Sequence, residues 1–336
     1  MDLKTLTEIN APSGHEQAIR RFLLDELKKL GFAPVLDRMG NVVVVKEGTG
    51  DAPRKRVMVS AHMDEVGLIV TSATEDGYLR IAAAGGIDPR VLVSKRVTVG
   101  EDKLPGVIGA VPIHLQSAAE RKHVLSMDEL LVDIGAKNND EAECKAPMGT
   151  YISFDTPYVE YGDGFACGKA FDDRVGCLSL LRLLQEELPV DLVACFVSEE
   201  EVGCRGAKGA AFQQEPDIGI VLEGTTCNDL GDVPETAHVC EAGQGVAVSF
   251  MDGASIANRA LFRKALDVAK QENIPHQVKH SVSGGNDGGA IQRAREGVPV
   301  VVLSVPCRYI HSPSSVVKLS DVESQFALVK ALVKAL

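Results

Sequence analysis

Short apolar runs alternate with amphipathic stretches in the first and last parts of the chain. The apolar runs are rich in β-branched residues, which favours buried strands, and the stretches between them repeat with the helical period. The expected strands cover residues 41–45, 56–61, 191–197, 218–222 and 298–305. The expected helices cover residues 16–30, 172–187, 255–273 and 320–336. This alternation predicts an α/β fold with a mixed, largely parallel sheet and helices on both faces.

Two of these helices are preceded by the pattern of a capping box, in which a Ser and a Glu three residues later bond to each other's backbone amides. The first pair is Ser13 with Glu16, and the second is Ser320 with Glu323. Gly31 is expected to end the first helix, because glycine readily adopts the left-handed conformation found there.

The pattern changes between residues 66 and 161, where β-branched runs at 79–82, 91–99, 106–111 and 151–154 alternate with Gly, Pro and Asp turns. Such short runs with frequent turns are typical of a small all-β barrel or sandwich. We therefore predict that residues 1–65 and 162–336 form the two parts of one α/β domain and that residues 66–161 form a β-domain inserted into it. His114 and His123, near a charged segment of this insertion, are interpreted as surface residues.

Composition narrows the class of protein. A chain of 336 residues with 45% hydrophobic and 24% charged residues is globular, and its net charge of −12 argues against nucleic acid or an anionic membrane as a partner. No apolar run reaches the length of about eighteen residues that a membrane span needs, and no signal peptide is evident, so we expect a cytoplasmic protein. The eight cysteines form no Cys-x-x-Cys pair and are expected to be reduced, mostly buried thiols.

Acidic and His residues cluster directly after the apolar runs. His62 and Asp64 follow the strand expected at 56–61, and because they are two residues apart, their side chains point the same way from an extended chain. This arrangement suits an imidazole ligand and a carboxylate that orients it. The other clusters lie within residues 170–174, 198–203, 222–226 and 309–313. Functional groups gather at the carboxyl ends of strands in an open α/β sheet, so all five segments could meet at one site.

The residue types in these clusters indicate metal chemistry. Two His and several carboxylates without sulfur suit zinc, cobalt or manganese, and the carboxylates are too many for one structural zinc. Two metals that share a carboxylate can activate a bridging water and polarise a carbonyl, which is hydrolase chemistry. Each cluster alone has an ordinary explanation: Asp172 and Asp173 could be first-turn charges of a helix, and residues 199–201 could be a solvated acidic turn.

Six motifs resemble those of the tetrahedral (TET) aminopeptidases, a family of cocatalytic metallopeptidases that includes chains called glutamyl aminopeptidase or cellulase M. The motifs are SAHMDEVG at 60–67, KAFDDRVG at 169–176, EEVGCRGA at 200–207, LEGTT at 222–226, GGNDGGAI at 284–291 and RYIHSP at 308–313. They span nearly the whole chain in order. The resemblance implies an aminopeptidase that removes amino-terminal residues from peptides with two divalent metal ions per subunit, zinc or cobalt, with manganese as an alternative.

The family's metal ligands can be assigned to this chain by position. The resemblance implies that His62, Asp172 and Glu223 bind one metal and that Asp172, Glu201 and His311 bind the other, with Asp172 as the bridge. Many relatives have Asp where this chain has Glu223, which leaves the preferred metal open.

The resemblance also assigns catalytic roles. Among the three adjacent glutamates, alignment on the following Val-Gly makes Glu200 the general base that acts on the metal-bridging water, and Asp64 matches the residue that orients the first imidazole. A cis peptide bond between Asp172 and Asp173 is implied as well. Asn286 and Gly288 differ from the Thr and Ala usual in the family, so substrate contacts there stay open.

Two other functions compete with this reading. A glycoside hydrolase would use two carboxyl groups and no metal, which leaves the two His without a role. A non-catalytic assembly or binding protein with the same fold would bind metal without turnover. The resemblance further implies that the inserted domain mediates self-association, as a dimer or a dodecamer built from dimers. The sequence does not indicate which amino-terminal residue is removed.

Overall fold

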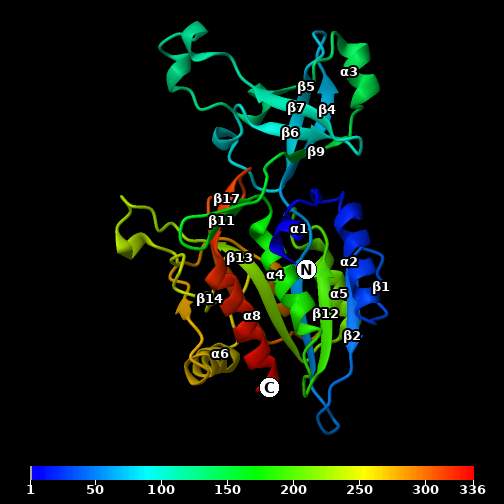
Figure 1. Cartoon of the computed structure of the whole chain (residues 1–336), viewed down its shortest axis with the longest axis vertical. Coiled ribbons are helices and arrows are strands. Elements are labelled where there is room, and N and C mark those ends of the chain that lie inside the picture. Colours follow the sequence, from blue (N-terminus) through cyan, green and yellow to red (C-terminus); the bar gives the residue numbers. More distant parts are fainter. Residues whose placement is uncertain (1) are drawn as a thin grey trace.

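The computed structural model describes residues 2–336, so Met1, the first residue of the segment predicted at 1–65, lies outside the described residues. The chain forms an α/β body and a small closed β-barrel that projects from one end of it (Figure 1).

The α/β body is built on an eleven-stranded mixed sheet. Its four central strands are parallel and lie in the order β12 (Asp191–Val197), β3 (Arg56–His62), β13 (Ile218–Thr226) and β16 (Val300–Arg308). The flanking strands pair mostly antiparallel; they are β1 (Val35–Leu36), β2 (Val42–Lys46), β10 (Val159–Tyr161), β11 (Phe165–Gly168), β14 (Val246–Ser249), β15 (His276–Val278) and β17 (Ser315–Lys318). The four central strands therefore end at the same edge of the sheet.

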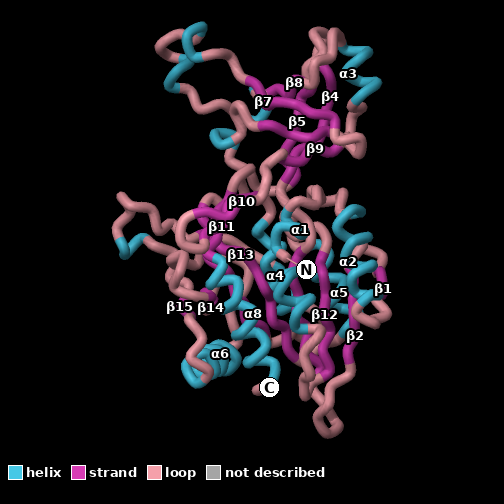
Figure 2. Tube along the Cα trace, viewed as in Figure 1, coloured by secondary structure: helices cyan, strands magenta, loops and turns pink. Residues whose placement is uncertain are grey.

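Alternate residues of the central strands face two separate apolar cores. In β3, Val57 and Val59 belong to one core and Met58 belongs to the other. The first core contains residues of α1 (Leu3–Thr7), α2 (Gln17–Lys29), α4 (Phe171–Leu183), α6 (Arg259–Gln271) and α8 (Leu319–Lys334). The second contains residues of α5 (Arg205–Gln214) and α7 (Asp287–Gln292). Helices thus cover both faces of the sheet (Figure 2), which confirms the predicted fold class.

The inserted part of the chain closes into a barrel with its own apolar core. Its strands, in spatial order, are β4 (Gly67–Ala73), β5 (Leu79–Ala84), β8 (Leu131–Asp133), β7 (Leu104–Gly109), β6 (Arg96–Val99) and β9 (Tyr151–Phe154). The helix α3 (Asn139–Lys145) packs beside β4. His114 and His123 lie in short turns on the barrel surface, as predicted. The chain leaves the α/β body after Glu65, which pairs with Lys169 of that body, and returns to it at β10.

Both predicted capping boxes are wrong. Helix α2 begins at Gln17, and the Ser13 hydroxyl donates to Asp64 Oδ2 at 2.6 Å rather than capping the helix, while Glu16 accepts a bond from the Gly14 amide. Gly31, with a φ of 87°, follows this helix as expected.

Helix α8 begins at Leu319, so Ser320 and Glu323 lie inside its first turns. Between them, the Asp321 carboxylate accepts bonds from the amides of Gly243 and Gly245. The Ser13 hydroxyl thus bonds to a distant residue, and Glu323 pairs with Arg182 at 2.8 Å instead of capping the helix.

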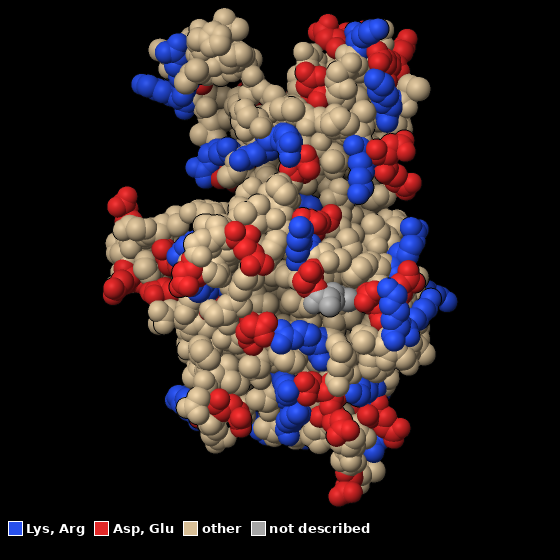
Figure 3. Space-filling model, in the orientation of Figure 1, with Lys and Arg blue, Asp and Glu red and all other residues tan. Residues whose placement is uncertain are grey.

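Three further observations bear on the class of protein. All eight cysteines are free and five are buried, as predicted. Within residues 2–336, no helix has both the length and the apolar character that crossing a membrane requires. On the face shown in Figure 3, acidic and basic side chains are intermingled rather than gathered by sign.

Candidate metal centre

The segments expected to carry ligands converge at the carboxyl edge of the central strands. His62 is the last residue of β3, and Glu223 lies in β13. Glu200 and Glu201 follow β12, and His311 follows β16. Asp172, the remaining predicted ligand, lies in the first turn of α4.

Asp172 lies between the two imidazoles. His62 Nε2 is 3.3 Å from Asp172 Oδ1, and His311 Nε2 is 3.5 Å from Asp172 Oδ2. The Gly224 amide also donates to Oδ1, at 3.0 Å. The peptide bond between Asp172 and Asp173 is cis, as the family resemblance implied. Each carboxylate oxygen of Asp172 therefore faces a different imidazole.

A second carboxylate lies beside each imidazole. Glu223 Oε2 is 3.5 Å from His62 Nε2, and Glu201 Oε2 is 3.1 Å from His311 Nε2. The structure thus brings all five predicted ligands together as two His-carboxylate groups that share Asp172.

Asp64 holds these groups in place from behind. It is fully buried and lies 3.4 Å from His62 Nδ1. Its two oxygens accept bonds from the Ser13 hydroxyl at 2.6 Å and from the amides of Glu200 and Glu201 at 3.1 and 3.2 Å. One carboxylate thus contacts the first imidazole and fixes the turn that carries the adjacent glutamates.

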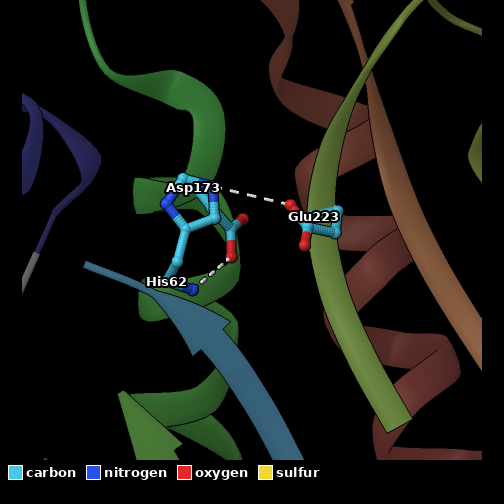
Figure 4. A group of neighbouring side chains, drawn as sticks. All are labelled: His62, Asp173 and Glu223. Carbon is cyan, nitrogen blue, oxygen red and sulfur yellow. Dashed lines mark hydrogen bonds and ion pairs between the residues drawn. The ribbon is translucent and has the colours of Figure 1, made fainter. Parts of the chain in front are cut away.

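Asp173 has a role that the sequence pattern did not indicate. Figure 4 shows it beside His62 and opposite Glu223. Its buried carboxylate accepts bonds from the His62 amide at 3.1 Å and the Gly176 amide at 2.9 Å. Asp173 therefore ties the end of β3 to the start of α4, rather than acting only as a helix-terminal charge.

The protonation equilibria reflect this crowding of buried acids. Burial raises the pKa of Glu201 to about 8 and that of Glu223 well above its ordinary value. Burial opposes protonation of His311, but its hydrogen bond to Asp172 raises its pKa to about 9. Among residues 2–336, Glu223 Oε1 is buried and has no hydrogen-bond partner. Divalent cations would compensate the negative charge of these buried carboxylates, and one could bind the unpartnered Glu223 oxygen. The residues present therefore fit metal ions bound through nitrogen and oxygen.

A cavity of about 490 Å³ opens onto this site, within the size range of small-molecule pockets. Asp172, Glu200 and His311 line it, and so do Gly86 and Asp88 from the barrel segment. The inserted domain contributes part of the wall, although none of the predicted ligands comes from it.

A mixed α/β sheet with two imidazoles and a group of carboxylates around a cavity at its carboxyl edge defines the class of metal-dependent hydrolases. Within that class, the chain belongs to the M42 glutamyl aminopeptidase family, whose sequence model matches residues 40–328. It is therefore a hydrolase of peptide bonds, and the resemblance to TET aminopeptidases is confirmed.

Individual relatives are consistent with this family assignment. The chain is 33% identical to the glutamyl aminopeptidase of Lactococcus lactis subsp. cremoris, over 99% of this chain and 95% of that protein. A TET aminopeptidase from the marine sediment archaeon Thaumarchaeota archaeon SCGC AB-539-E09 superposes with a TM-score of 0.94 at 33% identity, covering 99% of this chain and 95% of that one. The TET1 peptidase of Pyrococcus horikoshii, described as able to assemble into a tetrahedron or a large octahedral shell, superposes with a TM-score of 0.87 at 32% identity, covering 99% and 98%.

Proposed function

We propose that the protein is a dinuclear-metal aminopeptidase. The proposal rests on the position of Asp172: each of its two carboxylate oxygens faces one imidazole, and a further carboxylate lies beside each imidazole. His62, Asp172 and Glu223 would hold one divalent ion, and Asp172, Glu201 and His311 would hold the other. Ligands of this type suit zinc or cobalt, and also manganese.

Two bound ions supply Lewis acidity that activates a water molecule and polarises the substrate carbonyl. The protein supplies the proton transfer. Glu200 lines the cavity beside both groups of ligands, and the bond from its amide to Asp64 fixes the turn that carries it. We assign to the Glu200 carboxylate the general-base role: it takes the proton of the attacking water and passes it to the departing amine nitrogen.

The three adjacent glutamates provide a matched test of this assignment. Glu200→Gln should leave metal content unchanged and lower kcat by roughly 10²–10⁴-fold, the usual effect of losing a general base. Glu201→Gln should lower metal content. Glu199→Gln is the control, because Glu199 pairs with Arg205 at 3.3 Å outside the ligand groups. Metal analysis and kinetics on amino-acid p-nitroanilides would decide, and a near-wild-type kcat for Glu200→Gln would show that the base is assigned wrongly.

The two competing functions are less well supported. A glycoside hydrolase needs no metal, so it leaves His62 and His311 unexplained, and family membership points to peptides. Activity on a glucan that survives a strong chelator would favour that function. Tight metal binding without turnover on any peptide substrate would favour a non-catalytic protein.

We further propose that the inserted domain, taken as residues 66–161, mediates self-association. A lobe of the barrel between β7 and β8 exposes four apolar side chains, at fractions of 58–70%: Val111, Ile113, Leu115 and Val124. Exposed apolar groups of this kind mark interaction surfaces, and a relative of the same fold assembles into a tetrahedron. The dimer and the dodecamer both remain compatible with this proposal.

Light scattering on lobe variants tests this proposal. Replacing Ile113 and Leu115 together by Asp should reduce the mass in solution. Met148→Asp is the control, because Met148 is an even more exposed apolar residue of the same domain, at 76%, and lies outside the lobe. A wild-type protein that is monomeric at every concentration would refute self-association.

A further inference from the structure

A third group of potential ligands lies next to the two described above. It consists of Glu200, from the turn after β12, Cys204, directly before α5, and Asp287, the first residue of α7. One ligand atom from each lies within 4.8 Å of the others. The Cys204 thiol donates to Glu200 Oε1 at 3.2 Å.

Asp287 is the unusual member of this group. Its side chain is completely buried, and neither carboxylate oxygen has a hydrogen-bond partner among residues 2–336. Within the same described residues, no Lys or Arg pairs with it. Buried carboxylates are normally paired or bound to a metal, because an isolated buried charge is costly. An unpartnered carboxylate beside a thiol and a second carboxylate is therefore an incomplete ligand set.

We propose that Glu200, Cys204 and Asp287 form a third cation site that is selective for thiophilic divalent ions. Burial raises the pKa of the Asp287 carboxyl group well above its ordinary value, so binding would release its proton together with the thiol proton to solvent and leave one thiolate and two carboxylates as ligands. Thiolate ligation favours zinc, cobalt or cadmium over manganese or magnesium. The two proposed catalytic sites contain no sulfur, so the third site differs from them in chemistry as well as position.

The proposed site has a functional consequence, and this consequence rests on the proposed role of Glu200. An ion held by the Glu200 carboxylate prevents that carboxylate from accepting a proton. Excess zinc or cobalt should therefore inhibit the enzyme, whereas excess manganese should not. The third ion would act as an inhibitor bound at the base.

Cobalt titration detects the site without reference to activity. The first two equivalents of Co²⁺ should bind through nitrogen and oxygen only, and a further equivalent should produce a near-ultraviolet thiolate-to-cobalt charge-transfer band. Cys204→Ala should abolish the band, while Cys144→Ala, which removes an exposed thiol on α3, should retain it. Asp287→Asn keeps the thiol and should weaken the affinity for the third equivalent of Co²⁺ by more than about tenfold. Absence of the band in the wild-type protein, or its loss in Cys144→Ala instead, would overturn the proposal.

Kinetics separate this proposal from the proposed function. In the wild-type enzyme, excess cobalt should lower the rate by about 10²-fold relative to two equivalents, and in Cys204→Ala the same ratio should stay near one. A band without inhibition would overturn Glu200 as a ligand of the third ion. A normal kcat for Glu200→Gln would instead refute the base assignment, while the band and its loss in Cys204→Ala would still report on the site.

Discussion

Replacing Asp64 by Asn tests how strongly the metal centre depends on its buried support. Asn has nearly the same shape as Asp but carries one acceptor oxygen and one donor amide in place of two acceptors. Asp64 accepts bonds from the Ser13 hydroxyl and from the amides of Glu200 and Glu201, and it lies 3.4 Å from His62 Nδ1. The substitution therefore changes donor-acceptor matching without opening a cavity.

The size of the expected loss in stability and metal affinity follows from the contacts of each Asp64 oxygen. If the Asn amide takes the place of Oδ2, it faces the Glu201 amide, and if it takes the place of Oδ1, it faces the Glu200 amide. Either orientation leaves one backbone N–H without an acceptor, which costs about 1–3 kcal/mol. The imidazole of His62 also loses its charged partner, and loss of such a partner typically weakens metal binding or activity by about 10–100-fold.

Titration calorimetry with zinc or cobalt, together with urea unfolding of the metal-free protein, would measure both effects. Ser13→Ala is the matched control, because it removes one of the donors and leaves the carboxylate in place. It should therefore weaken metal binding less than Asp64→Asn does. Metal affinity of Asp64→Asn within twofold of the wild-type value would refute the idea that Asp64 organises the site.

Three further predictions follow from contacts near the site. Lys169→Met should lower the free energy of unfolding by about 3 kcal/mol, because the buried Glu65 carboxylate, now 2.7 Å from the Lys169 ammonium, would keep Arg174 at 3.9 Å as its only cationic partner. Adding Glu65→Gln should recover much of this loss in urea unfolding. Chelation should lower the melting temperature, since each ion at a free concentration of 100 times its Kd stabilises the fold by about 2.7 kcal/mol. A chelated protein that melts at the same temperature as the metal-loaded protein would contradict the proposed metal centre. Lys279 lies in the cavity wall, where its ammonium donates to the Ser283 carbonyl oxygen at 3.0 Å, and it should favour substrates with an acidic amino-terminal side chain. Lys279→Met should therefore lower kcat/KM for a glutamyl substrate by about tenfold relative to a leucyl substrate. Equal losses on both substrates would refute this role.

The sequence predicted the parts of the site that obey a general rule of the fold. His62 and Glu201 could be expected to meet because each lies at or just after the end of an apolar run, and parallel strands end at a common edge. The same reasoning located the strands β3 and β12 to within a residue or two. Apolar periodicity and the shared edge thus predicted the sheet and the meeting of the five clusters, whereas the individual ligands were assigned from the family resemblance.

The features that the sequence did not predict depend on partners far away in the chain. Ser13 has the local pattern of a helix cap, but its hydroxyl bonds to Asp64, 51 residues away. Asp173 is indistinguishable by residue type from its neighbour Asp172, and only the fold shows that it binds the backbone of β3. Asp287 lies on a short helix instead of after a strand, so the rule that found the other acids does not apply to it. Burial and missing partners are properties of the folded chain alone.

The ligands of the proposed metal centre are spread from His62 to His311, and the segments that carry them come together only in the finished sheet. During synthesis, a ribosome-bound chain that has not yet extended past β16 lacks the second imidazole, and no shorter stretch contains both groups of ligands. Contacts between such distant segments form late and slowly compared with local ones. Peptide cleavage is consequently unavailable to a partly made or partly folded chain. On the proposed mechanism, catalysis can begin only after synthesis has passed His311 and the central strands have paired.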